Sequence, residues 1–136
     1  MDIELLLRVK EAILAEPKRL DMWGWLDTTS KRENPSGPEC GTIGCISGWA
    51  CVLKEKEAGG LRTFRGAARR LLNDGRAGLF AGAKILDLTM RQAGDLFEPA
   101  RWPKDLDLHE TVEGTPEHAE TVARGIDRFI ANGGHW

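Results

Sequence analysis

The segment Glu39-Cys-Gly-Thr-Ile-Gly-Cys-Ile-Ser-Gly-Trp-Ala-Cys51 contains every cysteine of the chain and opens an apolar helical pattern. Thr42 is a favourable N-cap, so we expect a helix over Ile43–Glu57 that stops at Gly59-Gly60. Cys45 then lies in the first turn, where unpaired backbone N–H groups and the helix dipole favour the thiolate. The same residue also fits a small buried hydrophobe, because free cysteine is among the most buried residue types. The sequence leaves both interpretations open.

Further helices are expected from apolar residues three and four positions apart and from capping residues. The expected helices run from Asp2 to about Ala15, over Leu61–Asn73, from Ala83 to Leu86, from Thr89 to Phe97 and from Thr115 to about Ala131. The side chains that we place in the core are Leu6, Val9, Ile13 and Leu14 of the first helix and Val122, Ile126, Phe129 and Ile130 of the last.

Residues 18–39 read as a long loop, in which a short hairpin between Trp23 and Cys40 is compatible with the sequence. The pattern therefore predicts an all-α fold, as one compact domain over residues 1–136 with about five helices.

Composition and charge narrow the class of protein. With 136 residues the chain suffices for one domain with a real core, and 41% hydrophobic and 29% charged residues are ordinary for a soluble protein. No apolar run could span a bilayer, and the start Met1-Asp2-Ile3-Glu4 is not basic, so we expect a cytoplasmic protein. The net charge of −2 argues against a general attraction to nucleic acid. We expect no sequence-specific DNA binding, because the short second helix of the helix-turn-helix-like stretch Ala83–Phe97 carries only Arg91 as a basic residue, with Asp95 and Glu98 nearby.

Four features of the sequence, taken in order, resemble those of a known group of proteins. The run Cys40-Gly-Thr-Ile-Gly-Cys-Ile-Ser-Gly-Trp-Ala50 is followed by Ile85-Leu-Asp-Leu-Thr89, by Ala93 and Leu96-Phe97, and later by Trp102-Pro103 and a terminal amphipathic helix. This order resembles small bacterial and phage proteins of unassigned function that share a Cys-Gly-Thr-x-x-Cys-x-x-Gly-Trp-Ala motif. The resemblance implies a shared small helical fold and transfers no catalytic residues.

One candidate chemistry is that of a cysteine-dependent hydrolase or transferase. Cys45 would be the nucleophile, activated by His109 or His118, with Asp105 or Asp107 orienting the imidazole. The alternative is that the cysteine belongs to the core. One cysteine with scattered histidines is not a signature of catalysis by itself, so the sequence favours the alternative.

A second candidate chemistry is zinc binding by Cys40 and Cys45 with a histidine. The spacing between these cysteines is at the loose end of the usual zinc knuckle. Cys51 cannot easily join them, because six helical residues advance ~600° around the axis. We therefore expect no metal and no other cofactor.

A third candidate is a ligand-binding surface. Arg62, Arg65, Arg69 and Arg76 follow one face of the expected third helix, and Trp23 and Trp25 lie in the long loop. Arginine and tryptophan dominate binding hot spots, and arginine pairs well with phosphate and carboxylate groups. The alternative is a solvated surface whose arginines pair with carboxylates of the same chain, such as those of Glu55, Glu57 or Asp95.

The function favoured by the sequence is a non-enzymatic binding protein, consistent with a phage or mobile-element origin. Its expected partner is a host protein or a phosphorylated or acidic ligand, held by the arginine face and the tryptophan loop. The cysteine enzyme and the small zinc domain remain the alternatives.

Overall fold

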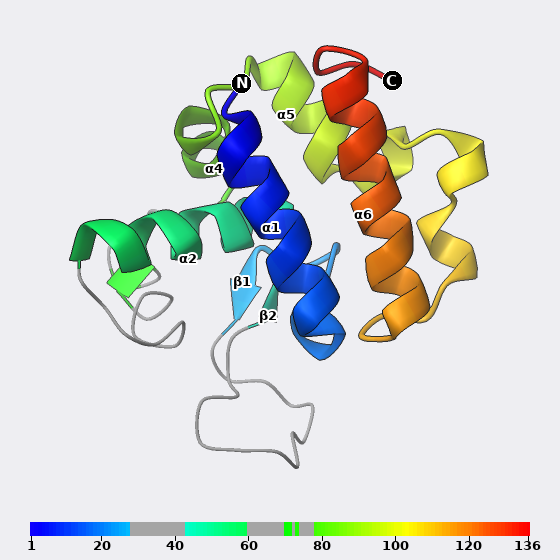
Figure 1. Cartoon of the computed structure of the whole chain (residues 1–136), viewed down its shortest axis with the longest axis horizontal. Helices are drawn as coiled ribbons and strands as arrows, with labels where there is room; N and C mark the ends of the chain where they lie inside the picture. The colour runs from blue at the N-terminus through cyan, green and yellow to red at the C-terminus, as the bar shows by residue number, and fades with distance from the viewer. Residues whose placement is uncertain (28–42, 60–69, 72, 74–77) are drawn as a thin grey trace.

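Two long helices from opposite ends of the chain lie side by side in the computed structural model. α1 covers Ile3–Ala15 and α6 covers Pro116–Ala131, and the two run antiparallel, so that both termini lie at the same end of the molecule (Figure 1). The structure describes residues 1–27, 43–59, 70–71, 73 and 78–136. Within them the fold is predominantly helical, which confirms the expected all-α class.

The N-terminal ends of both helices begin at the capping residues that the sequence predicts. The Asp2 side chain accepts a hydrogen bond from the Leu5 N–H at 2.9 Å, and the Thr115 side chain accepts one from the His118 N–H, directly before Pro116. Of the side chains expected in the core, Leu6, Val9, Ile13, Val122, Ile126 and Phe129 are buried, and Ile130 is partly buried against them. Leu14 was wrongly placed in the core and is exposed, because it lies about 100° around the helix from Ile13.

The hairpin is present but lies later in the sequence than expected. β1, Leu26–Asp27, pairs antiparallel with β2, Ile43–Gly44, in the register Leu26 to Gly44 and Asp27 to Ile43. The second strand thus falls beyond Cys40. It also occupies residues that the sequence assigned to the second helix.

That second helix, α2, therefore covers Ile46–Gly59 and begins three residues after the expected start. Cys45 precedes it and acts as its N-cap, since the Cys45 carbonyl accepts from the Trp49 N–H at 2.9 Å. All residues from Ile46 to Leu53 are buried, so α2 is the central helix of the core. The Trp49 indole is 1% exposed and donates to the Arg19 carbonyl at 3.2 Å, which confirms its expected burial.

α4, Leu79–Ile85, packs on α2, and its closest approach depends on Gly82. A Cβ atom at Gly82 would lie 2.0 Å from the Ser47 Oγ and 2.7 Å from the Ser47 Cβ. The Ser47 hydroxyl in turn donates to the Gly78 carbonyl at 2.7 Å. The sequence predicted only the last part of α4, from Ala83.

α5, Met90–Phe97, has the predicted capping box between Thr89 and Gln92. The irregular segment after it contains three short 3₁₀ helices, η2 (Pro99–Arg101), η3 (Lys104–Leu106) and η4 (Leu108–Glu110), with a further one, η1 (Pro17–Arg19), after α1. The expected third helix, Leu61–Asn73, lies largely outside the described residues. No helix in the described part of the chain combines the length and apolar character that crossing a bilayer requires.

Candidate functional site

Four of the residues singled out in the sequence meet at one cavity of about 400 Å³, which we call the tryptophan cleft. Trp23, Trp25, Cys45 and His109 all line it. They come from the loop before β1, from the start of α2 and from η4, so only the tertiary fold brings them together. The other described residues that line the cleft are Met22, Gly24, Leu79, Phe97, Glu98, Pro99 and Ala100.

The loop that carries the tryptophans is held by backbone hydrogen bonds at both of its ends. The Asp21 carboxylate accepts from the Trp23 N–H at 2.9 Å and from the Gly24 N–H at 3.1 Å. The Gly24 carbonyl then accepts from the Cys45 N–H at 3.0 Å, which ties the loop to the start of α2. Despite these bonds, Trp23 and Trp25 remain 47% and 49% exposed. The two indoles are therefore anchored through their backbone and presented to solvent.

Cys45 lies in the wall of the cleft and is 3% exposed. Its thiol Sγ donates to the Trp25 carbonyl at 3.7 Å. Burial raises the pKa of the Cys45 thiol above its ordinary value, backbone N–H groups of Gly48 and Ser47 act in the opposite direction, and the negative charge of Asp21 raises it further. Burial has the larger effect, so of the two interpretations left open by the sequence the structure favours the buried cysteine over the stabilised thiolate.

The two candidate histidines contact the same tryptophan but lie in different surroundings. The exposed His109 ring meets Trp23 edge to face, with ring centroids 5.4 Å apart, and the buried His118 ring lies 6.0 Å from Trp23 on a tilted plane. His118 Nδ1 is 2.8 Å from the Thr111 Oγ1. His109 thus shares the cleft with Cys45, whereas His118 is part of the core beneath Trp23.

The carboxylates expected to orient an imidazole are engaged elsewhere. Asp107 accepts from the backbone N–H of His109 at 2.8 Å and caps η4, and Asp105 pairs with the Arg128 guanidinium at 2.6 Å. Within the described residues the Cys45 thiol donates to a carbonyl oxygen. Among the described residues, neither of these two carboxylates forms a hydrogen bond to the His109 ring, as the orienting acid of a cysteine nucleophile would.

The arginine face falls outside the described residues, because Arg62, Arg65, Arg69 and Arg76 all belong to the segments left undescribed. Their neighbour Arg70 pairs with Glu55 through its Nε at 2.9 Å. Of the other carboxylates proposed as internal partners, that of Glu57 pairs with Arg8 and that of Asp95 lies 3.5 Å from Arg101.

The zinc alternative also depends on a residue that the structure does not describe, since Cys40 lies outside the described residues. Across residues 1–27, 43–59, 70–71, 73 and 78–136, no three His, Cys, Asp or Glu side chains are grouped closely enough to hold a metal ion. Cys45 and Cys51 are both free thiols.

The sequence did not identify the apolar half of the cleft, formed by Met22, Leu79, Phe97, Pro99 and Ala100. Phe97 and Pro99 were interpreted as the end of a helix and its stop signal, and nothing local in the sequence indicates that this end faces Trp23. Comparison with known proteins gave no match to any family model, curated protein or solved structure.

Proposed function

We propose that this chain is a non-enzymatic binding protein that holds a partner protein by receiving one apolar side chain of that partner in the tryptophan cleft. The observation that carries the proposal is the pair of half-exposed indoles, Trp23 and Trp25, at the edge of an apolar cavity of about 400 Å³. Tryptophan is enriched among the residues that dominate binding energy, and binding pockets are mostly apolar and largely preformed.

An apolar anchor fits this cleft better than a charged group. Most of the described side chains around the cleft are apolar, and the one carboxylate among them, that of Glu98, pairs with the Arg101 Nε at 2.6 Å. A charged ligand group would lose part of its hydration against these apolar side chains, whereas an apolar side chain would release water from both indoles. The partner's own anchor is therefore an aromatic or large aliphatic residue.

Catalysis by Cys45 is the less favoured function. Its thiol is buried, its pKa is raised by burial, and it donates a hydrogen bond to the backbone carbonyl of Trp25. These features suit a structural contact that positions Trp25.

Two further parts of the proposal rest on the sequence. The partner is a host protein if the chain is phage or mobile-element encoded, and the arginine face Arg62, Arg65 and Arg69 supplies a second contact to acidic or phosphorylated groups. We place the protein in the cytoplasm, where reducing conditions would maintain Cys45 and Cys51 as thiols.

The test is an NMR titration with N-acetyl-L-phenylalaninamide as a small apolar anchor. The indole N–H signals of Trp23 and Trp25, assigned from their Phe variants, should shift with saturation behaviour. The signals of Trp49 and Trp102 serve as internal controls, because these indoles are buried and donate to the Arg19 and Leu96 carbonyls. N-acetyl-L-glutamine amide is the polar control ligand. Equal shifts at all indoles, or none at Trp23 and Trp25, would refute the proposed cleft.

A further inference from the structure

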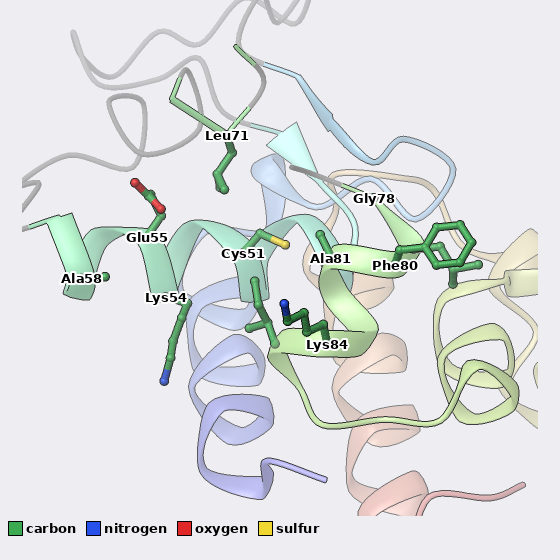
Figure 2. Close-up of a pocket in the computed structure, with 11 residues that line it drawn as sticks. Cys51, Lys54, Glu55, Ala58, Leu71, Gly78, Phe80, Ala81 and Lys84 are labelled. Atoms are coloured by element: carbon green, nitrogen blue, oxygen red, sulfur yellow. The ribbon is translucent and has the colours of Figure 1, made fainter. Parts of the chain in front are cut away.

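A second cavity lies between α2 and α4, on the other side of Leu79 from the tryptophan cleft. Its volume is about 650 Å³, and Figure 2 shows side chains from both helices around it. Apolar walls come from Cys51, Leu71, Leu79, Ala81 and Ile85, while Phe80 at its edge is 77% exposed. This volume lies within the roughly 300–1,000 Å³ that small-molecule sites occupy.

The charged side chains around this cavity differ in whether they form ion pairs. Lys54 and Lys84 line it, and Figure 2 shows the Lys84 side chain extending from α4 back toward α2. Among the described residues neither lysine forms an ion pair. The carboxylate of Glu55, which also lines the cavity, pairs with Arg70 at 2.9 Å. The cavity therefore combines apolar walls with two exposed ammonium groups that have no carboxylate partner among the described residues.

We infer that the α2–α4 cavity binds a small amphipathic anion, of the size and chemistry of a medium-chain carboxylate. Its hydrocarbon part would cover Leu71, Leu79 and Ile85, and its carboxylate would pair with Lys84 and, at the rim, with Lys54. Burying apolar area drives such binding, and the charge-assisted bond to an ammonium selects an anion over a neutral or cationic amphiphile.

The inference goes beyond the proposed function and does not depend on it. Of the described residues, only Leu79 lines both cavities. A partner protein in the tryptophan cleft needs Trp23 and Trp25, and neither tryptophan is among the described residues of the second cavity. Binding at one site can therefore fail while binding at the other persists.

The experiment measures dodecanoate binding to the full chain by isothermal titration calorimetry, below the concentration at which the ligand forms micelles. Dodecanol and dodecyltrimethylammonium serve as the neutral and cationic ligands of equal chain length. We expect dodecanoate to bind about tenfold more tightly than dodecanol, and the cationic amphiphile to bind more weakly still.

Variants locate the site. Lys84→Gln should weaken dodecanoate binding about tenfold and leave dodecanol unchanged, while Lys104→Gln, on η3 and outside the lining, should have no effect. Ala81→Phe should fill the cavity and weaken the binding of both dodecanoate and dodecanol. Circular dichroism and thermal unfolding would establish that this variant is folded. Trp25→Ala should leave dodecanoate affinity unchanged.

Three results would overturn the inference: no saturable binding of dodecanoate, equal affinity for all three amphiphiles, or equal loss with Lys84→Gln and Lys104→Gln. Vesicles of phosphatidylglycerol provide a last comparison. If the protein sediments with the vesicles but does not bind free dodecanoate, the two lysines belong to a membrane-binding surface and the proposed small-ligand site is wrong.

Discussion

The Cys45 thiol donates a hydrogen bond to the backbone carbonyl of Trp25, at an Sγ to O distance of 3.7 Å. This bond links the residue that caps α2 to the backbone of Trp25, one of the two tryptophans that border the tryptophan cleft. The most conspicuous cysteine of the sequence thus lies in the wall of that cleft.

Cys45 should react slowly with thiol reagents in the folded protein. Burial raises the pKa of its thiol and limits access, so iodoacetamide at neutral pH should modify it far more slowly than in the guanidinium-unfolded chain. Peptide mass spectrometry after timed quenching would measure both rates. Rapid selective labelling of Cys45 in the folded state would instead favour the cysteine enzyme.

The Cys45 thiol should make the free energy of unfolding depend on pH in the alkaline range. The pKa of Cys45 is higher in the folded than in the unfolded state, so the folded state holds this proton more tightly. Its contribution to the free energy of unfolding is therefore complete below the ordinary thiol pKa of about 8.5 and decreases as the pH rises above that value. Urea unfolding from pH 7 to 10 should show a steeper loss for the wild type than for Cys45→Ala. Parallel curves would contradict this assignment.

Trp49→Ala should destabilise the fold by about 3–5 kcal/mol, the range expected when a buried aromatic side chain is removed. The indole is 1% exposed within the core and donates to the Arg19 carbonyl. Trp23→Ala is the comparison, because that indole is half exposed and should cost less. Chemical denaturation of both variants would measure the difference, and a Trp49→Ala cost no larger than that of Trp23→Ala would be inconsistent with the packing described.

Gly82→Ala should destabilise the protein by about 1–3 kcal/mol, because the added methyl group overpacks the contact between α2 and α4. The new Cβ would lie 2.0 Å from the Ser47 Oγ. In the double variant with Ser47→Ala, part of that clash is removed, so the two changes should be non-additive. A thermal unfolding series of the four proteins would measure the coupling. Strict additivity would indicate that the helices have moved apart.

The proposed binding role of the arginine face can be tested by comparing Arg65 and Arg69 with the neighbouring Arg70. Charge reversal at Arg65 and Arg69 should abolish binding of an acidic or phosphorylated ligand and leave the melting temperature nearly unchanged, since exposed charges contribute little to stability. Arg70→Ala serves as the comparison, because Arg70 pairs with Glu55 and its loss should lower stability modestly. If the reversals lower stability as Arg70→Ala does and no ligand is lost, those arginines form internal ion pairs.

Local signals predicted α1, α5 and α6 well because the caps of these helices depend on residues close in sequence. The caps at Asp2, Thr89 and Thr115 all form as expected. The start of α2 was misplaced because Ile43 pairs with Asp27, and this long-range pairing overrides the capping preference of Thr42.

The candidate site was predicted only in part, for a similar reason. Trp23, Trp25 and Cys45 were identified from residue type, but their position around one cavity depends on Leu79 and Phe97. Those residues carry no local signature of binding. The sequence left open whether Cys45 is a thiolate or a buried thiol, because burial, which here outweighs the helix N-terminus, is a property of the whole core.

The most direct test of the tryptophan cleft uses peptides selected from a display library on the wild-type protein alone, whose binding is then measured on the wild type and on a Trp23→Ala, Trp25→Ala double variant. Calorimetry with the synthetic peptides should give at least a tenfold loss of affinity for either single tryptophan variant, while Lys104→Gln remains unchanged. The enriched peptides should share one aromatic or large aliphatic residue, and its replacement by alanine should cause a similar loss. Selected peptides that bind the double variant as tightly as the wild type would contradict the account.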